Sequence, residues 1–152
     1  TMTIRFAAAT FWATFALLPD APALAQNEPP ARSRSGETVY REICSACHEK
    51  GVAHAPKFGD RSAWTPIAEE GQHVVTAEAW VGVRAMPPRA GQDDLTLAEF
   101  SRGVAYMARN GGADWPDPDA RMLARIAREV GRHIDERIAE LRRMKRELAT
   151  AR

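Results

Sequence analysis

Apolar residues recur at helical spacing along much of this 152-residue chain, and the pattern predicts an all-α protein. A first helix opens at Gly36, directly after Ser35 as its cap, and points Val39 toward a core. Two short helices are predicted in the middle of the chain. One opens at Thr65, which is followed by a proline, and the other opens at Thr76.

The clearest helix signals lie between residues 95 and 112. Thr96 and Glu99 are spaced as a capping box, and Leu95 with Phe100 forms a hydrophobic staple across it. The sequence Asn110-Gly111-Gly112 is typical of a helix end. A helix from about residue 97 to residue 110 therefore closes the central part of the chain.

A second long amphipathic pattern occupies residues 118–149, after a cap at Asp117-Pro118. Such a helix would be about 50 Å long, whereas a domain of this size should be only about 30 Å across. We therefore expect the stripe to pair with another copy of the chain or with a partner helix; an exposed helix without function is the alternative. Its apolar positions, which follow no clean heptad, are Leu123, Ile126, Val130, Ile134, Ile138, Leu141, Met144 and Leu148.

The N-terminus has the pattern of an export signal. Arg5 precedes an apolar run over 6–18, and Ala23-Leu24-Ala25 matches a cleavage site, so residues 1–25 are predicted to be a signal peptide. The run is shorter than the roughly 20 residues of a membrane-spanning helix, which disfavours an anchor. The proline- and serine-rich residues 26–35 are predicted to be a linker, and the mature protein is expected in the periplasm.

Charge excludes some partners. The chain carries 21 basic and 20 acidic residues, a formal net charge of +1, so no field of one sign points to nucleic acid. The polar face of the C-terminal helix mixes acids with bases, and contact with a membrane surface is therefore the third choice for that helix.

The strongest chemical signal is Cys44-Ser45-Ala46-Cys47-His48. Two cysteines three residues apart lie on one face of a helical turn, where both sulfurs can reach one porphyrin, and His48 follows as an iron ligand. A structural zinc site would need four ligands, and these are the only cysteines in the chain. A redox dithiol would normally accompany a βαβ pattern that the sequence lacks. Covalently attached haem c is therefore the favoured cofactor.

Five further residues are candidates for the haem site. Met86 lies in a loop stiffened by two prolines and is the best second axial ligand. The carbonyl of Pro56 is a candidate acceptor for the Nδ1 proton of His48. Trp64 and Trp80 are expected in the haem pocket, where one indole N–H could donate to a propionate, and Arg89 could pair with a propionate or remain in solvent.

Several separated segments resemble the small bacterial class I cytochromes of the c-five type. They are GVAHAPKFGDRSAW, MPPRAG and VAYMARN, together with a glycine eight residues and a tyrosine four residues before Cys44. The resemblance covers about residues 36–111. It implies a few short helices around one haem, histidine–methionine ligation and electron transfer in respiratory chains. No cysteine remains for the disulfide that some relatives carry.

These observations predict a class I cytochrome c fold over residues 36–112 with a helical extension over 113–152. The expected function is electron transfer with redox partner proteins, not enzymatic turnover. Two alternatives remain open at this level. The C-terminal helix could make the chain a haem subunit of a larger redox complex, or an open iron position could bind a small ligand or support catalysis.

Overall fold

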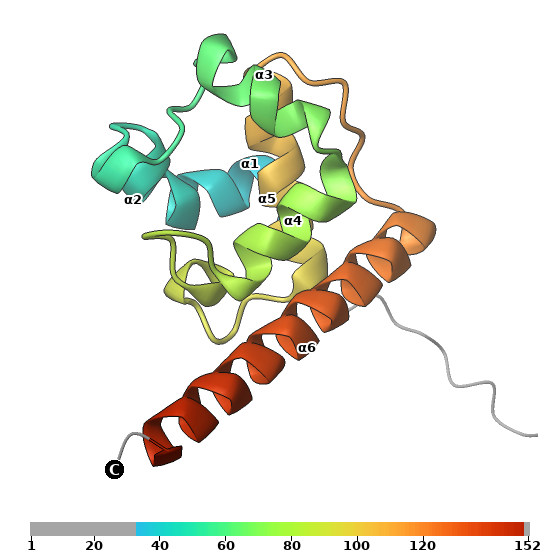
Figure 1. Ribbon diagram of the computed structural model, residues 1–152. Helices are drawn as coiled ribbons and strands as arrows, with labels where there is room; N and C mark the ends of the chain where they lie inside the picture. The colour runs from blue at the N-terminus through green and yellow to red at the C-terminus, as the bar shows by residue number, and fades with distance from the viewer. Residues whose placement is uncertain (1–32, 151–152) are drawn as a thin grey trace, which may run out of the picture.

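A computed structural model describes residues 33–150, and these residues form helices around two hydrophobic clusters, with Trp80 packed against both (Figure 1). The predicted signal peptide and most of the predicted linker lie outside the described residues. Between residues 33 and 150 the structure contains no strand, only an isolated bridge between Val83 and Met86. The all-α prediction is therefore confirmed.

The first three elements form one continuous stretch of helix with a wider π-helical turn in the middle. The remaining helices are separated by loops and turns. In chain order the elements are α1 Gly36–Val39, π-helical η1 Tyr40–Cys44, α2 Ser45–His48, 3-10 helix η2 Val52–His54, α3 Arg61–Glu69, α4 Gln72–Val81, 3-10 helix η3 Pro88–Gly91, α5 Leu97–Asn110 and α6 Ala120–Thr150.

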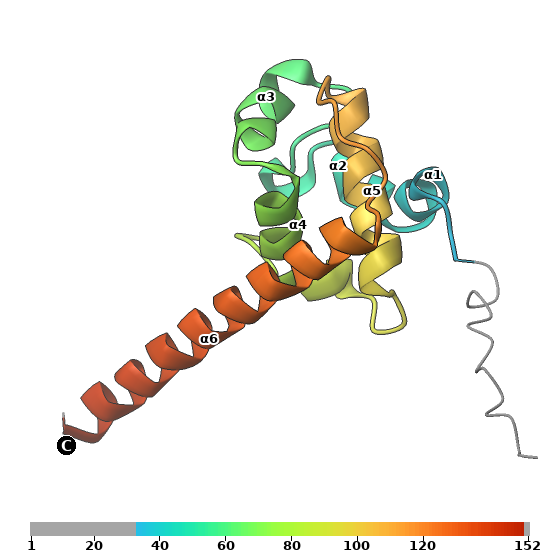
Figure 2. The same ribbon diagram turned by 90° about the vertical axis from the view of Figure 1, so that its right-hand side faces the viewer.

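Helix α1 crosses α5 at very short distance, and glycines on both helices permit it (Figure 2). A Cβ atom built on Gly36 would stand 2.3 Å from the carbonyl oxygen of Arg102. One built on Gly103 would stand 2.8 Å from Cγ1 of Val39, which is itself fully buried. The crossing therefore depends on the absence of side chains at these two positions.

Local capping signals place the ends of α1 and α5 where the sequence predicted them. The Ser35 hydroxyl accepts from the backbone N–H of Thr38. Thr96 and Glu99 form both bonds of the capping box. The buried Glu99 carboxylate also accepts from the backbone and guanidinium of Arg34, which ties the chain before α1 to the start of α5.

The predicted starts of the two middle helices are wrong. Helix α3 begins at Arg61 because Asp60 caps it, accepting from the backbone N–H groups of Ser62 and Ala63, so Thr65 lies inside the helix. Helix α4 begins at Gln72, and buried Thr76 donates its hydroxyl proton to the Gln72 carbonyl 2.6 Å away. Each threonine lies inside its helix, and its hydroxyl donates to the backbone carbonyl four residues earlier.

Residues 111–119 form a strap that crosses the body between α5 and α6. The Arg109 guanidinium donates to the Trp115 carbonyl at 2.9 Å and pairs with Asp117. The Gln72 amide donates to the Pro116 carbonyl, also at 2.9 Å. These bonds hold the strap on the body and thereby set the direction in which α6 leaves it.

Helix α6 begins at Ala120, two residues later than predicted, because the carboxylate of Asp119 accepts from the N–H of Met122. Its first half packs against α4, where Ile126 and Val130 are buried. Its second half extends past the body (Figures 1 and 2). None of the helices in the described range, α6 included, has the combination of length and apolar character needed to span a membrane.

Candidate functional site

The helical turn that ends at His48 brings the two cysteines and the histidine together. Cys44 closes the π-helical stretch and is buried, with its sulfur near Gly103 of α5. Cys47 is exposed, one turn further on. His48 is only 7% exposed and is the last residue of α2. The three groups thus lie at the C-terminal end of the helical stretch that runs from α1 to α2, and of the three Cys44 lies beside α5.

The loop after α2 fixes the imidazole of His48. Its Nδ1 atom lies 2.9 Å from the carbonyl oxygen of Pro56, within hydrogen-bonding distance. The backbone N–H of Phe58 donates to the His48 carbonyl at 2.7 Å. A proton held on Nδ1 leaves the lone pair on Nε2, which is the arrangement that a metal-binding histidine requires.

The arrangement fits a covalently attached haem. Two thiols within one helical turn match the two attachment points of the porphyrin, and Nε2 of His48 is the available donor for iron. No cluster of three or more histidine, cysteine, aspartate or glutamate side chains suited to a metal ion occurs within residues 33–150. The zinc alternative therefore finds no ligand set in this region.

Trp64 supports the loop that follows His48. Its ring is 3% exposed and lies 6.4 Å from the His48 ring between centroids. The indole N–H donates to the carbonyl of Lys57 at 2.9 Å. Because this single N–H is already used within the chain, Trp80 is the better candidate of the two tryptophans for a bond to a haem propionate.

Met86 lies in a tight turn after α4. Its backbone N–H donates to the Val83 carbonyl at 2.9 Å, and the turn begins at Gly82, whose φ of +91° suits glycine. A Cβ at Gly82 would stand 3.0 Å from the ring nitrogen of Pro88. The Met86 side chain is half-buried and packs against the core cluster that contains Cys44 and Trp64.

Trp80 and Arg89 lie together at the same end of α4. The Arg89 guanidinium carbon stands 5.1 Å from the Trp80 ring centroid, a cation–π contact. A guanidinium N–H of Arg89 also donates to the backbone carbonyl of Asp93. The Trp80 ring packs edge-on against Phe100 in the core. The side chain of Arg89 is therefore exposed but held against the ring and the chain.

Burial also affects the attachment thiols. It raises the pKa of the Cys44 thiol to about 11, since a thiolate is poorly solvated there.

Sequence reasoning missed an aromatic cluster behind the histidine loop. Phe58 stacks on Tyr40 with ring centroids 4.1 Å apart, and Tyr106 of α5 lies 5.6 Å from Phe58. Spacing along the chain gave no hint of Phe58, because it comes from a loop. Gly103 was also missed, although a glycine in the middle of a strong helix is itself a signal of close packing.

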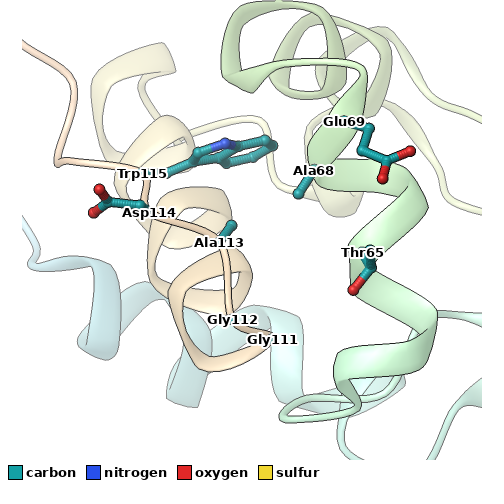
Figure 3. A pocket seen from close by; sticks show the side chains of 8 residues that line it. All are labelled: Thr65, Ala68, Glu69, Gly111, Gly112, Ala113, Asp114 and Trp115. Carbon is teal, nitrogen blue, oxygen red and sulfur yellow. The ribbon is translucent and has the colours of Figure 1, made fainter.

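The hollow shown in Figure 3 lies away from this site. It is formed between α3 and the strap, with Trp115 lying toward Ala68 and Glu69, and with Gly111 at its base. A Cβ on Gly111 would collide with Trp64, at 2.3 Å from its Cγ. None of the predicted haem residues lines the hollow, although Trp64 lies directly behind Gly111.

Comparisons with known proteins agree with this geometry. Residues 31–107 match the family model described as cytochrome C oxidase, cbb3-type, subunit III. Cytochrome c-555 of Chlorobaculum thiosulfatiphilum is 36% identical over an alignment of 77 residues, and the match covers 48% of this chain and 90% of that protein. Cytochrome c5 of Azotobacter vinelandii is 35% identical over an alignment of 78 residues, and the match covers 50% of this chain and 94% of that protein.

Among solved structures, one similar chain comes from the crystal structure of an electron transfer complex of nitrite reductase with cytochrome c. It is 42% identical, the match covers 50% of this chain and 93% of that one, and the TM-score is 0.48. The matched family segment ends before α6. The family match, the two similar cytochromes and the Cys44–His48 turn together show that this chain belongs to the class I c-type cytochromes, which carry covalently attached haem c.

Proposed function

We propose that this protein is an exported single-haem electron carrier in which His48 and Met86 would hold the haem iron. The hydrogen bond between Nδ1 of His48 and the Pro56 carbonyl carries the proposal, because it prepares Nε2 as a metal ligand. When bound, haem c supplies one iron that cycles between Fe(II) and Fe(III).

The proposal assigns one role to each residue that would hold the haem. Cys44 and Cys47 hold the porphyrin by thioether bonds, and the Pro56 carbonyl keeps His48 oriented and makes it a stronger donor. Met86 offers a soft thioether that favours the reduced ion and raises the potential. With both His48 and Met86 on iron, no position would remain for a substrate, so the role proposed is electron transfer and not catalysis.

Met86 is favoured over the other methionines of the described chain by its setting. Met107 is 2% exposed in α5, Met122 packs between α6 and α4, and Met144 lies on the protruding half of α6. Met86 alone among these four lies in a loop. The Met86 backbone N–H is bonded to the Val83 carbonyl, and two prolines follow Met86. Both features reduce the conformational entropy that the loop would lose on holding a weak ligand.

The absorption spectrum of the oxidised holoprotein tests the ligation. Methionine bound to ferric haem gives a sulfur–iron band in the far red. We expect this band in the wild type, its loss in Met86→Leu, and its retention in the control Met144→Leu. A wild-type spectrum without the band would instead favour an open iron position and a small-ligand-binding haem protein or enzyme.

Export is proposed on the N-terminal pattern alone. We expect protein recovered from the periplasm to begin near Gln26 and to carry the added mass of one haem. Intact-mass measurement of the purified protein tests both statements together. Arg89 and Trp80 are proposed to border the haem edge through which electrons pass to redox partners, during brief and weak encounters.

A second candidate role is that of a haem subunit held in a larger redox complex. The observation that favours it is the half of α6 that extends beyond the body with exposed apolar side chains. A truncation after His133 keeps the part of α6 that packs on α4. Unchanged electron delivery to membrane fractions by this variant would count against the subunit role.

A further inference from the structure

The second half of α6 exposes an apolar seam that the body does not cover. The strap holds the start of the helix, and α4 covers Ile126 and Val130, so the position of the seam is fixed. Beyond that point the apolar side chains face solvent. Their exposed fractions are 45% for Ile134, 39% for Ile138, 56% for Leu141, 47% for Met144 and 71% for Leu148.

This part of α6 follows a local heptad although the whole stripe does not. Ile134, Leu141 and Leu148 are seven residues apart and fall at d positions, while Ile138 and Lys145 fall at a positions. A seam of this kind needs another helix to insert between its side chains. We propose that the occupant is α6 of a second copy of this chain, running antiparallel.

The charges beside the seam select the antiparallel direction. In a parallel pair, Arg137 at a g position would face Arg142 at an e position of the other copy, and the two Lys145 ammonium groups would meet within the seam. In an antiparallel pair with Ile138 beside Leu141 of the second copy, Asp135 faces Arg142. That ion pair forms twice, and both repulsions disappear.

A groove beside the seam supplies a second reason for the same occupant. It lies between the end of α4 and the middle of α6, lined on its apolar side by Val81, Val83, Ile134 and Ile138. Its acidic residues are Glu78, Glu136 and Glu140, against a single arginine, Arg137.

The antiparallel register brings the basic end of the second copy level with this groove. That end contains Arg142, Arg143, Lys145 and Arg146, against one acid, Glu147. Glu78 and Glu140 form no salt bridge with any residue in the range 33–150. An acidic groove therefore receives a basic helix end in both halves of the dimer.

The body lies against the first half of α6, and the second half extends past it (Figures 1 and 2). In an antiparallel pair joined through the second halves, the two bodies would therefore stand at opposite ends. The two haem sites would then face separate partners. The proposal does not depend on the function proposed above, because association is measured without any redox reaction.

Sedimentation equilibrium of the mature holoprotein over a range of concentrations tests the dimer. We expect a reversible monomer–dimer equilibrium, abolished by the double variant Ile138→Asp/Leu141→Asp. The haem spectrum and helix content should stay unchanged, because both side chains are exposed. A wild type that stays monomeric at millimolar concentration overturns the proposal, as does a monomer that binds anionic vesicles through this face.

Charge exchange tests the direction without deleting apolar groups. Arg142→Asp and Asp135→Arg should each weaken the dimer by about tenfold, and the combined exchange should restore it, because the pair occurs twice. The control Arg125→Asp, on the opposite side of α6, should leave association unchanged. A parallel pair predicts the reverse for Arg142→Asp, since it removes the clash with Arg137, and a tighter dimer would overturn the antiparallel arrangement.

Discussion

Gly36 faces the carbonyl oxygen of Arg102 so closely that a single added carbon would stand 2.3 Å from it. The obstacle is backbone, which cannot rotate away as a side chain would. We expect Gly36→Ala to push α1 off α5 and to lower the free energy of unfolding by about 1–3 kcal/mol. Chemical denaturation of the holoprotein measures the loss.

Gly131 provides the matched control for this substitution. It also lies in a helix, but a Cβ there would meet nothing within 4 Å. Gly131→Ala should therefore stabilise the protein by about 0.5–1 kcal/mol, since alanine is the better helix former. Equal effects at the two positions would show that the short crossing is not what makes Gly36 necessary.

The bond network around Glu99 predicts a loss of stability in acid. Hydrogen bonds from Arg34, with further bonds from Thr96, lower the pKa of the buried Glu99 carboxyl to about 2 from its ordinary value of 4.5. A group with a lowered pKa stabilises the fold above its unfolded-state pKa. That contribution, at most about 3 kcal/mol, is lost as the pH falls from about 4.5 through 2.

The variant Glu99→Gln tests this assignment by the pH dependence of stability. It should be less stable than the wild type at pH 7, and the gap should narrow steadily toward pH 2. The control Glu37→Gln breaks an exposed pair with Arg41 and should change stability by less than about 1 kcal/mol. A gap between wild type and Glu99→Gln that stays constant with pH would contradict the lowered pKa.

Replacing Gly82 should distort the turn that places Met86. Gly82→Ala combines a positive φ with contacts of 3.0 Å to the Pro88 ring, so we expect about 1–3 kcal/mol of strain in the loop. A weaker far-red band in the oxidised spectrum should accompany it. Gly59→Ala has a similar φ of +77° but open space around it, so it should lower stability and leave the band intact.

Trp64 should act on the histidine loop and not on the haem propionates. Trp64→Phe keeps most of the buried ring but leaves the Lys57 carbonyl without its donor, at a cost of about 1–3 kcal/mol. Thermal unfolding of the holoprotein measures this cost. If Trp64 instead served a propionate, the variant would shift the midpoint of a redox titration with little change in stability.

Sequence signals succeeded where the structure depends on neighbours in the chain. The cap at Ser35 and the capping box at Thr96 and Glu99 were both predicted, because each bond joins residues three apart. The same reasoning failed at Thr65 and Thr76. Their hydroxyls suit a cap, yet both residues lie inside a helix. Helix α3 begins four residues before Thr65, after Asp60, and α4 begins four residues before Thr76, after Gly71.

The amino-acid sequence by itself determined the chemistry of this protein. The thiols of Cys44 and Cys47 and the imidazole of His48 are fixed relative to one another by a single helical turn, so no distant contact is needed to predict haem attachment. The excess length of the C-terminal helix over the body followed in the same way, from rise per residue and chain length.

Only the tertiary structure decided how the site is supported and which part of α6 is covered. Phe58 on Tyr40, the Trp64 indole on the Lys57 carbonyl, and Gly36 against Arg102 join residues that are distant in sequence or lie in loops without periodicity. The strap likewise sets where α4 stops covering the apolar stripe. Such contacts depend on how several elements fit together in space, and local propensity carries no information about that fit.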